Sequence, residues 1–213
     1  MKYKAIIFDW NGTVIDDVQG CLDILCTMLN RYGLNAVTME EYRQAFTFPV
    51  IEYYKKVGFV FDNYTFEEVA AHFVPMYDET YPKCKLYDGV VELIKKLKND
   101  GIAVYLLSAT EKGSLIEQTD YFGVTALFDE IVGTDNFHGK SKSEEGKNLL
   151  ERIGCERKNV LLIGDTNYDY ELSKELGVEC VLMSYGHKPR ETLEKCTKNV
   201  FPNVQKLKDF LYK

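Results

Sequence analysis

Basic charge is scarce in this sequence, and its scarcity limits the partners that the protein can bind. The 213 residues include 33 Asp and Glu but only 26 Lys and Arg, a formal net charge of −7. This balance disfavours nucleic acid and anionic membranes as partners, because both require a basic face on the protein. An anionic substrate would therefore need a local site and a cation within it.

Long hydrophobic runs and cysteine motifs are also missing. The longest early apolar run, Ala5 to Phe8, stops at Asp9, far short of a signal-peptide core or of the roughly 20 residues that span a bilayer. The six cysteines form no C-x-x-C pair and have no histidines at zinc-ligand spacing, which favours reduced thiols. We expect a folded cytoplasmic protein, either a monomer or a homodimer.

Apolar runs and helical periodicity alternate along most of the chain. Short, β-branched runs predict buried strands at residues 3–8, 104–107, 130–132, 160–163 and 179–183. Apolar residues at helical spacing lie between them, at 90–97, 149–153 and 172–176, and Gly154 and Gly177 follow the last two helices. This order predicts an α/β fold with a doubly wound parallel sheet.

The segment from residue 17 to residue 85 differs from the rest. It has helical patterns at 21–32, 50–57 and 66–77 but no convincing strand. We therefore predict a core formed by residues 1–16 and 86–213, with an inserted helical domain at 17–85. A final surface helix is predicted at 204–213.

Carboxylates follow two of the predicted strands. Asp9 ends the first strand, just before Asn11-Gly12-Thr13, and Asp165 and Asp169 follow the strand at 160–163. Ligands bind at the carboxyl edge of open α/β sheets, and carboxylates gathered there repel unless a cation such as Mg²⁺ lies among them. Any one of these aspartates could instead cap a turn or helix; for Asp9 and Asp165 together we favour the metal site.

Two further segments carry weaker signals. The strand at 102–107 is followed by Ser108-Ala109-Thr110, which offers a hydroxyl and backbone N–H groups at the head of a helix, where anions bind. Lys140 and Lys142 lie before the strand that leads into Gly164-Asp165, and they could neutralise a phosphoryl group and a nucleophilic carboxylate together. A plain helix cap and solvated lysines are the alternative interpretations.

In their order and spacing, four segments resemble the motifs of the haloacid dehalogenase-like hydrolases. They are FDWNGT at 8–13, LLSAT at 106–110, a lysine of GKSK at 139–142, and IGDTNYD at 163–169. The resemblance covers essentially the whole chain and is strongest to the phosphoglycolate phosphatase-like branch. It implies a Rossmann-like core with a helical cap, and hydrolysis of a small phosphorylated metabolite.

The resemblance also implies roles for individual residues. Asp9 would take the phosphoryl group, and Mg²⁺ would be held by the Asp9 carboxylate, the Asn11 carbonyl and Asp165, with Asp169 in the outer shell. Ser108, the Ala109 N–H and Thr13 would bind the substrate. The motif-three lysine is Lys140 or Lys142, and we favour Lys142. Substrate choice would depend on the cap around residues 46–54.

Asn11 departs from the family pattern. Most phosphatases of this kind carry a second aspartate two residues after the nucleophile, and it protonates the leaving alcohol. An amide cannot exchange a proton near neutral pH, and loss of a general acid costs about 10²- to 10⁴-fold in rate. Another group could supply the proton, and the candidates are Asp16, Asp17, Glu111, His72 and Tyr53.

Other functions remain open at this point. A protein that binds a phosphate or metabolite without turnover would also fit Asn11. A phosphoacceptor signalling domain is a weaker alternative, because the insertion is large. A dinucleotide-binding oxidoreductase is disfavoured because no G-x-G-x-x-G follows the first strand.

Overall fold

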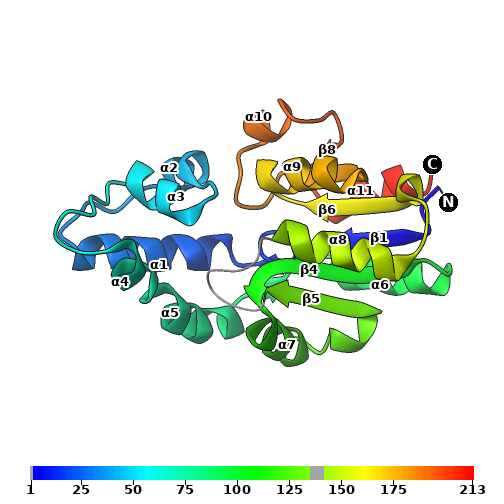
Figure 1. The fold of residues 1–213 in the computed structure, drawn as a ribbon, viewed down its shortest axis with the longest axis horizontal. Helices are drawn as coiled ribbons and strands as arrows, with labels where there is room; N and C mark the ends of the chain where they lie inside the picture. The colour runs from blue at the N-terminus through cyan, green and yellow to red at the C-terminus, as the bar shows by residue number, and fades with distance from the viewer. Residues whose placement is uncertain (1, 135–141) are drawn as a thin grey trace.

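The main sheet is parallel throughout. The structure is a computed structural model that describes residues 2–134 and 142–213. Six strands are ordered β5-β4-β1-β6-β7-β8, and Figure 1 shows β5, β4, β1 and β6 in this order. Their bounds, in that order, are Glu130–Thr134, Ala103–Glu111, Ala5–Phe8, Val160–Gly164, Glu179–Met183 and Val200–Phe201. The predicted α/β class with a parallel sheet is confirmed; β8 was not predicted.

Helices cover both faces of this sheet. The cluster on one face contains Ile6 and Phe8 with α6 (Val90–Asn99), α7 (Lys112–Tyr121) and α11 (Val204–Leu211). The cluster on the other contains Ala5 and Ile7 with α8 (Lys142–Ile153), α9 (Asn167–Leu176) and α10 (Arg190–Leu193). Neighbouring β1 residues point to opposite faces, and each fully buried Ile or Phe contributes roughly 1.5–3 kcal/mol. Strand β1 is therefore fixed from both sides.

The helices and connecting loops of residues 18–83 build a hydrophobic cluster of their own beside the sheet (Figure 1). The elements are α1 (Val18–Arg31), α2 (Met39–Ala45), α3 (Val50–Lys56), α4 (Phe66–Ala70), α5 (Phe73–Thr80) and η1 (Tyr81–Lys83). The chain enters and leaves this segment through a two-stranded antiparallel ribbon, β2 (Ile15–Asp16) with β3 (Lys85–Leu86). We call residues 17–85 the helical segment.

The predicted helix at 66–77 is wrong in one respect, because it is two helices. Helix α4 ends at Ala70 and α5 begins at Phe73. Pro75 has no N–H to donate to the carbonyl of Ala71 and would clash with it in a continuous helix. Restarting the helix at Phe73 places Pro75 in the first turn, where no such hydrogen bond is required. Helix α2 was not predicted; Thr38 and Glu41 form its capping box.

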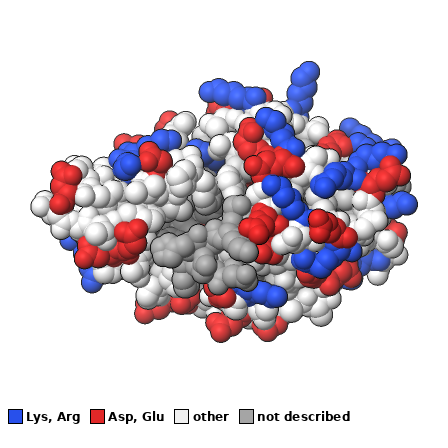
Figure 2. Space-filling view, in the orientation of Figure 1, with Lys and Arg blue, Asp and Glu red and all other residues white. Residues whose placement is uncertain are grey.

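Short 3₁₀ turns, η2 (Thr125–Leu127) and η3 (Arg157–Asn159), precede β5 and β6. All six cysteines are free. Among the described residues, no helix combines the length and apolarity needed to cross a membrane. On the face drawn in Figure 2, Lys and Arg side chains are interspersed with Asp and Glu.

Candidate active site

Three carboxylates meet at the carboxyl edge of the sheet. Asp9 follows β1, Asp165 follows β6, and Asp169 lies in the first turn of α9, and their oxygens lie within 4.8 Å of one another. The parallel register pairs Phe8 with Ile163, so the residues after these strands become neighbours. Asp9 has 12% of its side chain exposed, against 1% for Asp169. Asp9 is thus the carboxylate in this cluster that an incoming molecule can reach.

Lys142 is the cation of the cluster. It opens the described part of α8, and its Nζ donates to Asp9 Oδ1 and to Asp169 Oδ1, both at 2.7 Å. Its side chain is only 4% exposed. The alternative motif-three lysine, Lys140, lies outside the described residues.

Asp169 has a full set of hydrogen-bond donors. One oxygen accepts from Lys142, and the other accepts from the Thr166 hydroxyl at 2.7 Å and from the backbone N–H groups of Thr166 and Asp165. Thr166 and Asp169 also form the capping box of α9. Asp169 therefore caps a helix and orients Lys142 at the same time, which leaves Asp9 and Asp165 facing the site.

The charge of this cluster is not balanced by Lys142. Burial raises the pKa of Asp9 to about 6, although Lys142 opposes the shift, and the charge of Asp169 adds to it. Burial likewise raises the pKa of Asp165 to about 8 against the charge of His187, and Asp169 and Asp9 contribute. Buried carboxylates that resist ionisation fit a divalent cation with oxygen ligands. The residues present therefore suit Mg²⁺.

Mg²⁺ should raise the melting temperature more at pH 8 than at pH 6. The carboxyls of Asp9 and Asp165 have pKa values above the ordinary value, so the folded protein holds more protons than the unfolded chain. Metal-free stability must then fall as pH rises from about 4 to 8. A bound cation removes the repulsion between the ionised carboxylates. A free Mg²⁺ concentration 100-fold above its Kd adds about 2.7 kcal/mol to the free energy of unfolding. Thermal unfolding in Mg²⁺ and in chelator at both pH values measures this; an equal Mg²⁺ effect at the two pH values would contradict it.

The predicted phosphate-binding segment lies beside this cluster but does not head a helix. Strand β4 runs through Ser108, Ala109 and Thr110 to Glu111, and α7 is capped by the Glu111 carboxylate, which accepts from Gly113 N and Ser114 N. The prediction of a helix start at 108–110 is therefore wrong, because a carboxylate farther along caps the helix. Ser108 is buried, with its hydroxyl 3.1 Å from Thr110 Oγ1, and Ala109 is exposed.

Thr13 and His187 lie against Asp165. The Thr13 hydroxyl is 3.3 Å from Asp165 Oδ1, and the His187 N–H donates to Oδ2 at 2.6 Å. Gly12, which precedes Thr13, has φ +66°, and a Cβ at this position would lie 2.3 Å from Asp165 Oδ2. The loop after β1 can therefore approach Asp165 this closely only with glycine at position 12.

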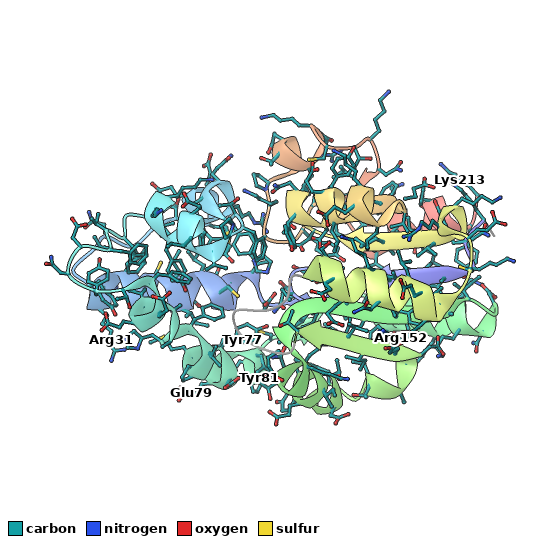
Figure 3. All side chains as sticks on the ribbon, viewed as in Figure 1. Arg31, Tyr77, Glu79, Tyr81, Arg152 and Lys213 are labelled. Carbon is teal, nitrogen blue, oxygen red and sulfur yellow. The ribbon has the colours of Figure 1, made fainter. Side chains whose placement is uncertain are left out.

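The Asn11 side chain faces the helical segment. Its Nδ2 donates to Asp17 Oδ2 at 2.7 Å and to the Tyr77 hydroxyl at 2.6 Å, and its Oδ1 accepts from Thr110 Oγ1 at 3.1 Å. Tyr77 lies on α5, where the helical segment meets the core (Figure 3). All polar atoms of the amide therefore have partners.

Of the proposed proton donors, only Asp17 contacts Asn11. Glu111 caps α7, Asp16 is exposed on β2, and His72 lies 2.9 Å from Arg31. The buried hydroxyl of Tyr53 has no hydrogen-bond partner among the described residues. The structure does not bring these four residues to Asn11.

Asp17, Cys21 and His187 form a second cluster of possible metal ligands. The Asp17 oxygens, however, already accept from Asn11, Gly12 and Tyr77. Burial raises the pKa of Asp17, but the charge of His187 and these side-chain hydrogen bonds outweigh it and hold the pKa below its ordinary value. Asp17 is thus an ionised carboxylate whose hydrogen-bond donors are groups of the protein.

Sequence reasoning missed His187, Tyr42 and Tyr77. Tyr42 Oη lies 2.7 Å from His187 Nδ1, which links α2 to the loop after β7. A signal for His187 existed, because Tyr185-Gly186-His187 follows the predicted strand at 179–183 and so lies at the ligand-binding edge. The tyrosines lie on helices whose packing against the core the sequence does not specify.

Aromatic residues of the predicted substrate-choice region, residues 46–54, approach the core beside the site. Phe46 stacks on His187 with ring centroids 4.9 Å apart, and Phe48 lies 4.7 Å from Tyr168. Tyr168 directly precedes Asp169. The rim of the site is therefore aromatic on the side of the helical segment.

These features agree with comparison to known proteins. The model of the haloacid dehalogenase-like hydrolase family matches residues 6–183, and the chain belongs to this family.

Relatives and solved structures extend the comparison. Phosphoglycolate phosphatase 1 of Pseudomonas aeruginosa is 24% identical and aligns over 96% of this chain and 78% of its own length. A 5'-nucleotidase of the same organism is 23% identical, over 87% of this chain and 85% of its own length. The structure of a haloacid dehalogenase-like hydrolase from Streptococcus pneumoniae superposes with a TM-score of 0.86 at 16% identity, covering 99% of both chains. The last likeness concerns the fold alone.

Proposed function

We propose that the protein is a Mg²⁺-dependent phosphatase that hydrolyses a small phosphate monoester through an aspartyl-phosphate on Asp9. One observation carries this proposal: Asp9 is the accessible member of a buried carboxylate cluster, held by Lys142 at 2.7 Å. A carboxylate fixed in this way can attack phosphorus. The relatives named phosphoglycolate phosphatase and 5'-nucleotidase support phosphate esters as substrates.

The chemistry divides into two displacements. Asp9 attacks the phosphorus, the bond to the leaving oxygen breaks, and the aspartyl-phosphate forms. Water then attacks this phosphorus, which releases phosphate and restores the carboxylate. Mg²⁺ held by Asp9, the Asn11 carbonyl and Asp165 would reduce the repulsion between the two anions.

The remaining residues of the site would bind the phosphoryl group and orient the carboxylates. Lys142 fixes Asp9 and offers its charge to the phosphoryl oxygens. Ser108 and the Ala109 N–H would bind those oxygens. The hydroxyl of Thr13, which lies 3.3 Å from Asp165 Oδ1, would orient the Asp165 carboxylate. We propose that the helical segment is a cap whose aromatic residues Phe46 and Phe48 contact the leaving group.

Asn11 limits the first displacement. Its side chain is an amide engaged with Asp17 and Tyr77, so it does not protonate a leaving alcohol. We therefore expect turnover to depend strongly on the leaving group. A second candidate function, binding of a phosphorylated metabolite without hydrolysis, is favoured by this same residue.

A panel of phosphate esters separates the two functions. With Mg²⁺, acetyl phosphate and p-nitrophenyl phosphate should be hydrolysed about 10²- to 10⁴-fold faster than alkyl phosphates, because their leaving groups need no proton. Failure of every ester, together with a rise in melting temperature on adding phosphate or a metabolite, would favour the binding protein.

A further inference from the structure

Asp17 is a buried carboxylate to which the reaction above assigns no role. It is fully buried. Oδ1 accepts from Gly12 N at 2.9 Å and lies 3.3 Å from His187 Nε2, an ion-pair distance without regular hydrogen-bond geometry. Oδ2 accepts from Asn11 Nδ2 at 2.7 Å, the Tyr77 hydroxyl at 2.8 Å and the Cys21 thiol at 3.6 Å.

These partners come from both parts of the molecule. Asn11 and Gly12 belong to the loop after β1, and His187 to the loop after β7. Cys21 lies on α1 and Tyr77 on α5, both in the helical segment; Tyr77 is labelled in Figure 3. Asp17 therefore joins the loop that carries the proposed nucleophile to the helices that cover it.

We propose that Asn11 and Asp17 are a matched pair of positioning residues, in which the buried charge at 17 requires an uncharged donor at 11. The amide of Asn11 is the shortest side-chain contact of Asp17, and it also donates to Tyr77. The missing acid at position 11 is on this account a consequence of where the charge lies. Asp17 in turn holds the helical segment against the nucleophile loop.

The pairing has a clear consequence for substitution. Asn11→Asp alone would place a second carboxylate where Nδ2 now lies 2.7 Å from Asp17 Oδ2. Two buried carboxylates at this distance repel, and the hydrogen bond is lost. Asn11→Asp combined with Asp17→Asn exchanges donor and acceptor and keeps one negative charge in the network.

The exchange also bears on rate, and this part rests on the proposed phosphatase function. In the exchanged protein, position 11 carries a carboxyl group that can take up a proton from solvent and give it to a leaving alcohol. Position 11 keeps its backbone carbonyl in every variant, so the expected metal ligand is unchanged. We expect the exchange to raise kcat for alkyl phosphates by about tenfold or more, and Asn11→Asp alone to give no gain.

A thermodynamic cycle tests the pair without relying on activity. Melting temperatures are measured for the wild type, Asn11→Asp, Asp17→Asn and the double variant, with Asp16→Asn as the matched exposed control. Each single change should lower the melting temperature by roughly 5–15 °C. The double variant should recover roughly half or more of the loss in Asn11→Asp, and the control should change little. Additive losses would overturn the proposal.

A milder cycle covers the case in which Asn11→Asp does not fold. Asn11→Ala and Tyr77→Phe each remove donors around Asp17, and their combined loss should be smaller than the sum of the separate losses. Additive losses would again overturn the proposed pairing of Asn11 and Asp17.

The stability and activity results separate the two proposals. If the losses of stability are not additive but no protein hydrolyses any ester, the pairing stands and the phosphatase function fails. An active wild type with no gain for alkyl phosphates in the exchanged protein would overturn the rate part.

Discussion

Replacing Asp9 with Ala should lower turnover of p-nitrophenyl phosphate by at least about 10⁴-fold, the scale of loss when a covalent nucleophile is removed. The folded state should survive, because burial and the charge of Asp169 raise the pKa of Asp9, and its ionised form is therefore a destabilising group. Lys142 keeps its hydrogen bond to Asp169 when Asp9 is removed. The loss should appear in kcat, with the melting temperature unchanged or higher in the absence of metal.

Asp16→Ala is the matched control for this experiment. Asp16 lies on β2, is exposed, and is not among the clustered carboxylates. Initial rates with purified proteins in saturating Mg²⁺ measure both variants. Turnover in Asp9→Ala close to that of the wild type would show that another residue accepts the phosphoryl group.

Replacing Lys142 with Met should lower the free energy of unfolding by about 3–5 kcal/mol in the absence of metal. Lys142 is the buried cation between Asp9 and Asp169, and its removal leaves their charges without that partner. Burial opposes ionisation of Lys142, but Asp169 and Asp9 outweigh it and raise the lysine pKa. Mg²⁺ should reduce the loss, because it supplies positive charge to the same cluster.

The pH dependence of this loss follows from Asp169. Burial would raise the pKa of Asp169, but the charge of Lys142 and hydrogen bonds from Lys142 and Thr166 hold it below the ordinary value. The ion pair therefore stabilises the protein above pH about 4 and is lost as pH falls through the folded-state pKa. Denaturant unfolding should show the full loss for Lys142→Met at pH 7 and a smaller loss at pH 3.

Lys147→Met, on an exposed turn of the same helix, is the control for Lys142→Met. Lys147 lies 4.0 Å from Glu175 with more than half of its side chain exposed. Exposed pairs contribute about 0–1 kcal/mol, so this variant should unfold almost as the wild type does. Equal losses in the two variants would contradict a special role for Lys142.

The carboxylate cluster could be predicted because it depends on local sequence and one rule of sheet geometry. Continuous apolar runs located β1 and β6, and parallel neighbours bring the residues after them together. Asp9 and Asp165 followed directly. Lys142 was favoured over Lys140, and of the two the structure describes only Lys142, in contact with Asp9.

The network around Asp17 could not be predicted in the same way. Tyr77 and His187 are 60 and 170 residues from Asp17, and their contacts depend on how the helical segment packs against two core loops. No periodicity encodes that packing. Glu111 was considered as a proton donor, yet it caps α7, because the strand β4 extends past the apolar run that predicted its end.

Acid quenching of the enzyme during turnover tests the central claim most directly. In the presence of Mg²⁺ and acetyl phosphate, we predict a peptide carrying Asp9 that is heavier by one phosphoryl group, with none in Asp9→Ala. Phosphate release without any modified peptide at Asp9, or with the phosphoryl group on another residue, would contradict the account.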